Sequence, residues 1–269
     1  MTEIKAIISD IDGTILTDHH QIDDELLSLL PQLTKKKIPF VLASARSPLG
    51  MAPIVHRLGL ENQPIASYNG ALIQLNQEIL FQHLVDKSEI RQIIQLITDY
   101  FPSISINIYS GQNWFTNHIN KWTQLEANIT GETPLLRPLL DPILDTLIPI
   151  HKLLLIGEPK LIQELQQQIG ALKLSLTTIY LSKENYLEVT ANVVSKEQAL
   201  KEIARYYQLD LNQIMTIGDN FNDIPMIQLA GLGVAMGNAP KEVKSAANRT
   251  TLSNNQHGVA RAIEQYVLT

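Results

Sequence analysis

The chain has 269 residues, 45% of them hydrophobic, which is enough to bury one large core or two smaller ones. Its formal net charge is −6 and its 21 Lys and Arg residues are scattered, so nucleic acid and anionic membranes are not expected as main partners. The chain contains no cysteine, which excludes disulfides, thiolate zinc sites and a cysteine nucleophile.

The apolar stretches of the chain are short. None is long enough to span a bilayer, and the first meets Asp10 at once, unlike the apolar core of a signal peptide. We therefore expect a cytoplasmic protein with no membrane partner, and the absence of cysteine fits a reducing compartment. A monomer and a homodimer are both compatible with the sequence.

Strands and helices alternate over the first part of the chain. Residues 4–9 (IKAIIS) and 38–44 (IPFVLAS) are short apolar runs that predict strands buried on both faces of a parallel sheet. A leucine-rich stretch from about residue 23 predicts a helix, and residues 47–60 predict another, with Ser47 as its cap. This order predicts right-handed βαβ units.

A different pattern fills the middle of the chain. The Asn69-Gly70 pair predicts a hairpin turn after a third strand, and beyond about residue 82 helices alternate with hairpin strands, as in an α+β domain. The predicted elements there are helices over 87–101, 118–129 and 160–172, strands over 103–110, 113–117, 151–157, 174–182 and 185–190, and a proline-rich loop over 131–145.

The parallel pattern returns after Ser195. The predicted elements are helices over 195–208, 224–231, 239–248 and 258–267 and buried strands over 213–219 and 232–237. We therefore expect an α/β fold in which residues 1–81 and 190–269 form a discontinuous parallel-sheet core and residues 82–189 form an inserted α+β domain.

Acidic residues follow two of the predicted buried strands. Asp10 and Asp12 end the first strand and project to the same side because they are two residues apart, while Asp219 ends another strand, with Asp223 soon after. Ligands of open α/β sheets bind at this edge. Two structural interpretations remain open, an ordinary Asp12-Gly13 turn and Asp223 as a plain helix N-cap.

Several carboxylates at one sheet edge would repel one another unless a cation joined them. An all-oxygen site prefers a hard cation such as Mg²⁺. An EF-hand loop is excluded because its glycine should come sixth, whereas here it comes fourth. Zinc is not expected, since the seven histidines show no ligand-like spacing and His19 and His20 belong to a predicted exposed loop.

The order and spacing of four stretches resemble the four motifs of the haloacid dehalogenase superfamily of phosphotransferases. They are DIDGTIL at 10–16, LASARS at 42–47, SKEQAL at 195–200 and GDNFNDIPM at 218–226. The NGA at 69–71 and the GVAMGNA at 233–239 further resemble the Cof-type branch, subfamily IIB, with a C2-type cap. The resemblance covers essentially the whole chain and implies a Rossmann-like core with an inserted cap domain.

The resemblance assigns roles to the acidic residues. It implies that Asp10 is a nucleophile that forms an aspartyl-phosphate, and that Asp12 is the general acid and base. It also implies that Mg²⁺ is held by Asp10, the main-chain carbonyl of Asp12, and Asp219, with Asp223 supporting the site directly or through water.

Phosphate-binding groups are implied in the same way. They are the Ser44 hydroxyl with the nearby backbone at Ala45, the amide of Ile11, the Lys196 cation and the Asn222 side chain. Alone, such a serine is an ordinary turn residue and such a lysine is solvated. Arg46 and Asn69 are further candidates at the site entrance. Ala45 replaces the usual glycine of the second motif, and Val193 and Glu197 replace glycines common around the third, which puts rate and substrate fit in question.

These residues predict a Mg²⁺-dependent phosphatase acting on a small phosphorylated metabolite, such as a sugar phosphate. A phosphomutase on the same scaffold is the nearest alternative, and a phosphometabolite sensor without turnover is the alternative from another class. A dehalogenase is disfavoured because halide departure needs no acid such as Asp12. In the cap, Tyr109, Trp114 and Tyr180 either face the substrate or belong to the core, and cap closure is expected to exclude water.

Overall fold

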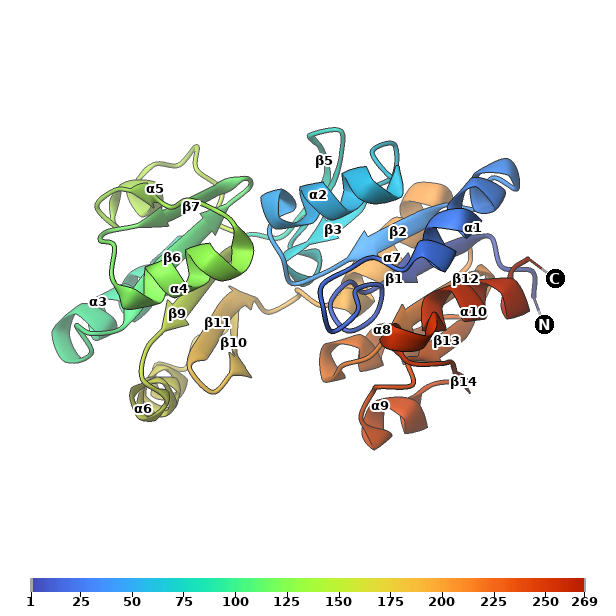
Figure 1. The fold of residues 1–269 in the computed structure, drawn as a ribbon. Helices are drawn as coiled ribbons and strands as arrows, with labels where there is room; N and C mark the ends of the chain where they lie inside the picture. Colours follow the sequence, from blue (N-terminus) through green and yellow to red (C-terminus); the bar gives the residue numbers. More distant parts are fainter. Residues whose placement is uncertain (1, 269) are drawn as a thin grey trace. The chain divides into compact units, whose positions relative to one another are not determined.

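The computed structural model describes residues 2–268, which divide into two compact units (Figure 1). Unit 1 holds the chain up to Ala45, then Met51–Phe81, and the chain from Ser195 onward, while unit 2 holds Arg46–Gly50 and Gln82–Val194. The chain therefore returns to unit 1 five residues later than the expected position 190. The last strand of unit 2 continues to Ala191, past the expected boundary, and the next helix begins at Lys196.

Unit 1 contains an eight-stranded sheet in the order β14-β13-β12-β1-β2-β3-β4-β5. Pairing is parallel from β14 to β3, and β4 runs antiparallel to β3. The strands are β1 (Ala6–Ser9), β2 (Phe40–Ala43), β3 (Ile65–Ser67), β4 (Leu72–Leu75), β5 (Glu78–Gln82), β12 (Ile214–Gly218), β13 (Leu232–Ala235) and β14 (Arg249–Thr250). The predicted parallel sheet is confirmed, whereas β5 and β14 were not predicted.

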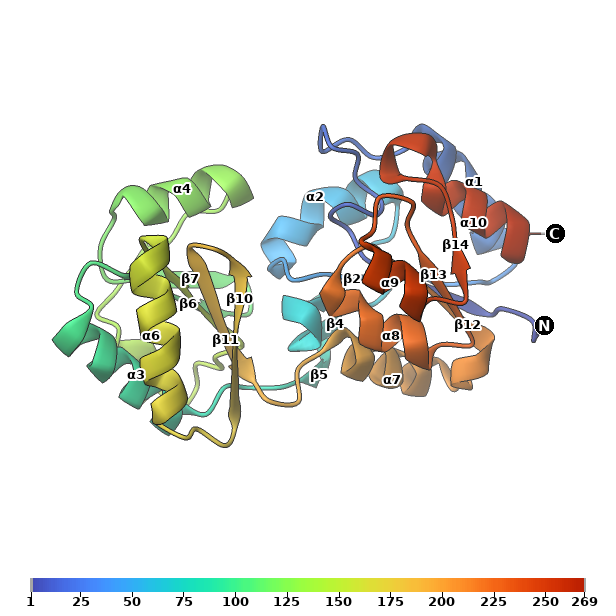
Figure 2. The same ribbon diagram turned by 90° about the horizontal axis from the view of Figure 1, so that it is seen from below.

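Helices cover both faces of this sheet (Figure 2). The helices are α1 (Asp24–Lys35), α2 (Pro48–Leu58), α7 (Lys196–Tyr207), α8 (Ile224–Leu229), α9 (Lys241–Ala246) and α10 (Gly258–Tyr266). In β1, Ile7 packs into a core with α1, α2 and α10, whereas Ile8 packs into a second core with α7 and α8. The continuous apolar run of β1 thus results from burial on both faces.

Short polar side chains fix where three of these helices begin. The backbone amide of Glu25 donates to Asp23, that of Gly50 to Ser47, and that of Gln198 to Ser195, at 2.9, 2.9 and 3.1 Å. Each cap satisfies an amide that has no partner within the helix. The predicted cap at Ser47 is confirmed.

The hairpin predicted at Asn69-Gly70 is also confirmed. The turn is a short 3₁₀ helix, η1 (Tyr68–Gly70), and β3 pairs with β4 on either side of it. Asn69 has φ of 57° and Gly70 has φ of 97°, a left-handed region that suits these two residue types.

The start of α10 is joined to the cap of α1 by an ion pair. Nδ1 of His257 lies 2.7 Å from Oδ1 of Asp23, and the hydrogen bond and charge of this aspartate raise the pKa of His257. Stability from a raised histidine pKa is present below the unfolded pKa and is lost as pH rises through the folded one.

We therefore expect His257→Ala to lower the free energy of unfolding more at pH 5.5 than at pH 8. The effect should be small because the histidine side chain is half exposed and the pair is screened by solvent. Urea unfolding at the two pH values measures it. A loss of equal size at both values would contradict the role of the ion pair.

Unit 2 contains a six-stranded sheet in the order β10-β11-β9-β6-β7-β8, antiparallel except between β7 and β8. Its elements are β6 (Ser105–Ser110), β7 (Asn113–Thr116), β8 (Leu135–Leu136), β9 (Lys152–Ile156), β10 (Thr177–Lys183), β11 (Tyr186–Ala191), α3 (Lys87–Tyr100), α4 (Lys121–Thr130), α5 (Asp141–Leu144) and α6 (Pro159–Ala171). One sheet face, including Ile106 and Leu153, packs with α3 and α6 in a single apolar core.

The expectation of a plain loop over residues 131–145 is wrong, because this segment contains β8 and α5. Leu135 pairs with Phe115 of β7, and Ile143 is buried in the apolar core of unit 2. Pro142 stands in the first turn of α5, where a missing amide hydrogen costs nothing. The prolines of this segment therefore lie at or near the ends of short elements and do not exclude secondary structure.

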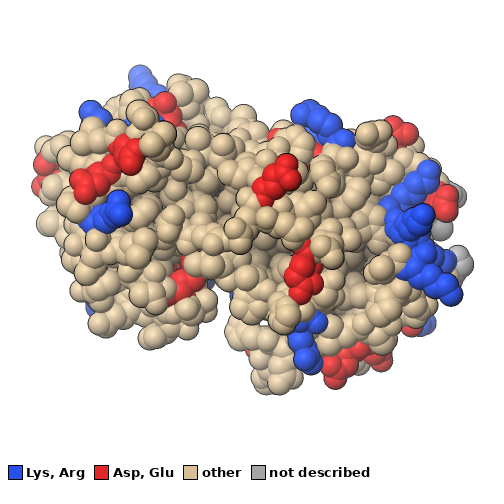
Figure 3. Space-filling model, turned by 90° about the horizontal axis from the view of Figure 1, so that it is seen from above, with Lys and Arg blue, Asp and Glu red and all other residues tan. Residues whose placement is uncertain are grey.

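On the face drawn in Figure 3, most charged side chains are separated from one another, and one group of basic side chains lies at the right-hand edge. The run Lys35-Lys36-Lys37 is exposed at the end of α1, where cations complement the helix dipole. Within residues 2–268, no helix combines the length and apolar character that a bilayer crossing requires.

Candidate active site

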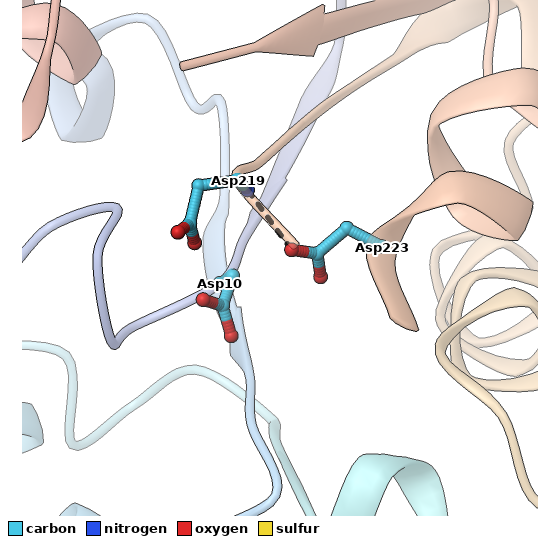
Figure 4. A group of neighbouring side chains, drawn as sticks. All are labelled: Asp10, Asp219 and Asp223. Carbon is cyan, nitrogen blue, oxygen red and sulfur yellow. Dashed lines mark hydrogen bonds between the residues drawn. The ribbon is translucent and has the colours of Figure 1, made fainter. Parts of the chain in front are cut away.

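Three aspartates meet at the carboxyl edge of the unit 1 sheet. Ser9 of β1 pairs with Ile217 of β12, so Asp10 and Asp219 follow neighbouring parallel strands. Carboxylate oxygens of Asp10, Asp219 and Asp223 all lie within 4.8 Å of one another, and the three side chains converge in Figure 4. The prediction that distant acidic clusters meet at one sheet edge therefore holds for these three residues.

Asp223 is anchored by the loop that follows β12. Its Oδ2 accepts hydrogen bonds from the backbone amides of Asp219 and Asn220, both at 2.9 Å. Gly218 permits this packing, because a Cβ there would lie 2.5 Å from the same oxygen. The side chain of Asp223 makes no capping bond to α8, so the plain N-cap interpretation is wrong.

Lys196, the first residue of α7, bridges two of the aspartates. Its ammonium group forms ion pairs with Oδ1 of Asp10 and, at 2.5 Å, with Oδ1 of Asp223. The lysine side chain is 1% exposed and that of Asp223 is 0% exposed. Both oxygens of Asp223 therefore have partners, Oδ1 the ammonium group and Oδ2 two backbone amides.

Burial dominates the electrostatics of the group. It raises the pKa of Asp10 to about 8, although the Lys196 charge opposes the shift, and it raises the pKa of Asp219 to about 6 with help from the Asp223 charge. Burial also disfavours the charged lysine, but the carboxylates of Asp10 and Asp223 outweigh it and raise the pKa of Lys196. One ammonium group therefore pairs with two acidic side chains while the third, Asp219, lies beside them, and this all-oxygen set suits a hard divalent cation.

The turn after Asp10 packs directly on Asp219. The Thr14 hydroxyl donates to Oδ1 of Asp219 at 3.0 Å and lies 3.5 Å from Oδ2 of Asp10. Gly13 has φ of +75°, and a Cβ there would lie 2.4 Å from Oδ2 of Asp219. Thr14 is not among the predicted site residues, although it is the only hydroxyl residue within the DIDGTIL motif.

Asp12 is exposed, and its carboxylate is outside the group of three. This fits the expectation that its carbonyl, rather than its side chain, faces the metal, and an exposed carboxylate can exchange protons with water. Ile11 is buried, and its carbonyl accepts the amides of Ile15 and Leu16. The roles expected for Asp12 and for the Ile11 amide stay predictions.

The second and fourth motifs are connected through Asn69. The carbonyl of Ser44, which follows β2, accepts the amide of Asn69 at 2.7 Å, and Oδ1 of Asn69 accepts Nδ2 of Asn222 at 3.2 Å. Nη1 of Arg46 donates to the carbonyl of Gly50 at 3.4 Å, so this guanidinium contacts the first turn of α2.

The three departures from the family pattern lie at positions where the fold accommodates the substituted residue. Ala45 is not among the described residues with positive φ, so alanine adopts its backbone without left-handed strain. The Val193 side chain is exposed, and Glu197 pairs with Lys201 at 2.5 Å on the surface of α7.

The cap aromatics have partners inside unit 2. Tyr109 and Trp114 are buried and stacked, with ring centroids 5.8 Å apart, and Nε1 of Trp114 donates to Asn107. Tyr180 donates to Glu188, which also pairs with Lys152 at 3.5 Å. These residues lie on the sheet face opposite the apolar core of unit 2 and form a polar and aromatic network.

Comparisons with known proteins agree with this arrangement. The family model described as haloacid dehalogenase-like hydrolase matches residues 7–263. A Haemophilus influenzae protein named "Putative phosphatase" is 34% identical over 97% of each chain. The 5-amino-6-(5-phospho-D-ribitylamino)uracil phosphatase YcsE of Bacillus subtilis is 28% identical over 99% of this chain and 97% of its own. A solved haloacid dehalogenase-like hydrolase from Bacteroides thetaiotaomicron is 27% identical with a TM-score of 0.89, covering 98% of this chain and 99% of its own.

Proposed function

The chain belongs to the haloacid dehalogenase-like hydrolase family, and we propose that it is a Mg²⁺-dependent phosphatase that hydrolyses a small phosphorylated metabolite through a phosphoryl group carried on Asp10. Hydrolysis of phosphate monoesters is the activity that the family and its curated relatives support. The metal, the intermediate and the substrate class are the finer parts of the proposal.

The environment of Asp10 is the main support for this function. Its carboxylate lies at the ligand-binding edge of a parallel sheet, held by the buried ammonium group of Lys196 and facing Asp219. A carboxylate fixed in this way can attack phosphorus. The same ammonium group can offset negative charge on the transferred phosphoryl oxygens.

Asp10 and Asp12 would carry out both steps of the hydrolysis. As the bond from Asp10 to phosphorus forms, the bond to the leaving oxygen breaks and Asp12 gives that oxygen a proton. Asp12 then takes a proton from water, whose oxygen attacks phosphorus and releases phosphate from Asp10. The exposed position of Asp12 suits both proton transfers.

The donor set fits Mg²⁺, with Asp10, the carbonyl of Asp12 and Asp219 as the proposed ligands. Bound there, the ion would offset the repulsion between carboxylates and a phosphate dianion. Asp223 is proposed to support the site through Lys196 and the loop amides rather than as a ligand.

Removal of divalent cations should therefore abolish most of the phosphatase activity. With EDTA, phosphate release from p-nitrophenyl phosphate is expected to fall by at least about a hundredfold and to return when Mg²⁺ is added. A colorimetric assay on protein whose metal content has been checked by mass spectrometry measures this. Full turnover by metal-free protein would refute the metal requirement.

A substrate panel separates phosphatase, phosphomutase and sensor. The panel should hold sugar phosphates, nucleotides, pyridoxal phosphate and a ribityl phosphate like that in the name of the Bacillus subtilis relative. A phosphatase releases inorganic phosphate, a phosphomutase returns it to another hydroxyl of the same molecule, and a sensor binds without turnover. Release of free phosphate is the expected result.

A further inference from the structure

A side chain from a third loop touches two parts of the acidic site. Asn238 lies between β13 and α9, and its Nδ2 donates to the carbonyl of Gly13 at 2.8 Å. The same nitrogen makes a longer contact of 3.4 Å with Oδ2 of Asp219. Asn238 therefore connects the turn that follows Asp12 with one of the proposed metal ligands.

The orientation of this amide is fixed by a backbone donor. Oδ1 of Asn238 accepts the amide hydrogen of Asn254 at 3.0 Å. Because a backbone N–H can only donate, the oxygen must face Asn254, and the two hydrogens on Nδ2 must face Gly13 and Asp219.

The loop that carries Asn238 is itself held at several points. The amide of Gly237 donates to the carbonyl of Leu252 at 2.9 Å, and Lys244 donates to the carbonyl of Gly237 at 2.6 Å. Asn254 is buried and donates through Nδ2 to the carbonyl of Leu16 at 3.0 Å. Asn238 is exposed, yet the backbone of the preceding Gly237 and the amide oxygen of Asn238 are both anchored.

Each oxygen of Asp219 thus faces a neutral donor. Oδ1 faces the Thr14 hydroxyl at 3.0 Å and Oδ2 faces Nδ2 of Asn238. Neutral donors orient a carboxylate without cancelling its charge, so the negative charge stays available to a cation. Since Gly13 packs against the same carboxylate, the amide sets the distance between the turn and Asp219.

We propose that Asn238 is a positioning residue that sets the affinity for Mg²⁺ by holding the Asp219 carboxylate and the Gly13 turn in register. The inference rests on the proposed Mg²⁺ site. Loss of a side chain that orients a metal ligand typically weakens metal binding about 10- to 100-fold.

Calorimetric titration of the full-length protein with Mg²⁺ alone tests this inference. Asn238→Ala and Asn238→Leu are both expected to raise the Kd for Mg²⁺ about 10- to 100-fold, the second while keeping the side-chain volume. The matched control is Asn255→Ala, because Asn255 is an amide on the neighbouring segment that bonds Asp18, outside the acidic group. Its Kd should stay within about twofold of the parent value.

Two further readouts separate positioning from general damage. The thermal midpoint of the metal-free Asn238 variants should stay close to that of the parent, and kcat at saturating Mg²⁺ should stay within about threefold. An unchanged Kd in both Asn238 variants would overturn the inference, even if their activity fell. A parent protein that binds no Mg²⁺ would instead overturn the proposed function.

Discussion

Asp10→Asn is expected to lower the rate of phosphate release by at least about a thousandfold. The amide has nearly the same shape as the carboxylate, but it cannot attack phosphorus as a carboxylate does. The variant should remain folded, because Lys196 keeps its ion pair with Asp223 and is not left as an unpaired buried charge. Values of kcat with p-nitrophenyl phosphate and Mg²⁺ provide the measurement.

A matched control for this variant is Asp24→Asn. Asp24 is an exposed residue in the first turn of α1 and is not one of the three converging aspartates, so the kcat of this variant should stay within about twofold of the parent value. Parental activity in Asp10→Asn would rule out Asp10 as the nucleophile. Equal ligand binding by the parent and by Asp10→Asn, with no turnover by the parent, would instead favour the sensor.

Lys196→Met should damage both stability and activity. Removing the ammonium group leaves the carboxylates of Asp10 and Asp223 buried without their shared cation, which should lower the free energy of unfolding by about 3 kcal/mol. Phosphate release should fall at least about a hundredfold, because the transferred phosphoryl group loses its cationic partner. Urea unfolding and the same phosphatase assay measure the two effects.

The stability loss in Lys196→Met should depend on pH. Burial already raises the pKa of Asp10 to about 8 with the lysine present, and removal of the lysine should raise it further. A carboxyl whose folded pKa lies above its unfolded value destabilises the fold increasingly as pH rises between the two. The loss should therefore be larger at pH 8 than at pH 5.

Lys201→Met is the matched control on the same helix. Lys201 forms an exposed pair with Glu197 one turn away, and such pairs contribute only about 0.5 kcal/mol or less. A similar loss of stability in both lysine variants would show that the buried ion pairs of Lys196 have no special weight.

The parts of the site that follow strands could be predicted from the sequence. Apolar runs ending in Asp10 and Asp219 indicated parallel strands, and parallel strands bring their carboxyl ends to one edge. The structure confirms that these two residues meet there, together with Asp223. Their convergence depends on backbone register, which periodicity reveals.

Contacts made by loops could not be predicted in the same way. Thr14 contacts Asp219 from the turn after β1, and Asn238 contacts it from the loop after β13. No periodic pattern in the sequence specifies where the side chains of such loops point. The elements β8 and α5 escape prediction because the prolines in 131–145 favour a loop, whereas burial of Ile143 overrides that local signal. Long-range pairing decided these features.

Rapid acid quench during turnover shows whether Asp10 carries the phosphoryl group. The parent protein with Mg²⁺ is mixed with p-nitrophenyl phosphate, quenched within milliseconds and digested, and the peptides are searched by mass spectrometry for added phosphate. The phosphoryl group is expected on Asp10 in the parent and should be absent from the Asp10→Asn variant. Steady turnover with no phosphate on Asp10, or with phosphate on another residue, would contradict the account.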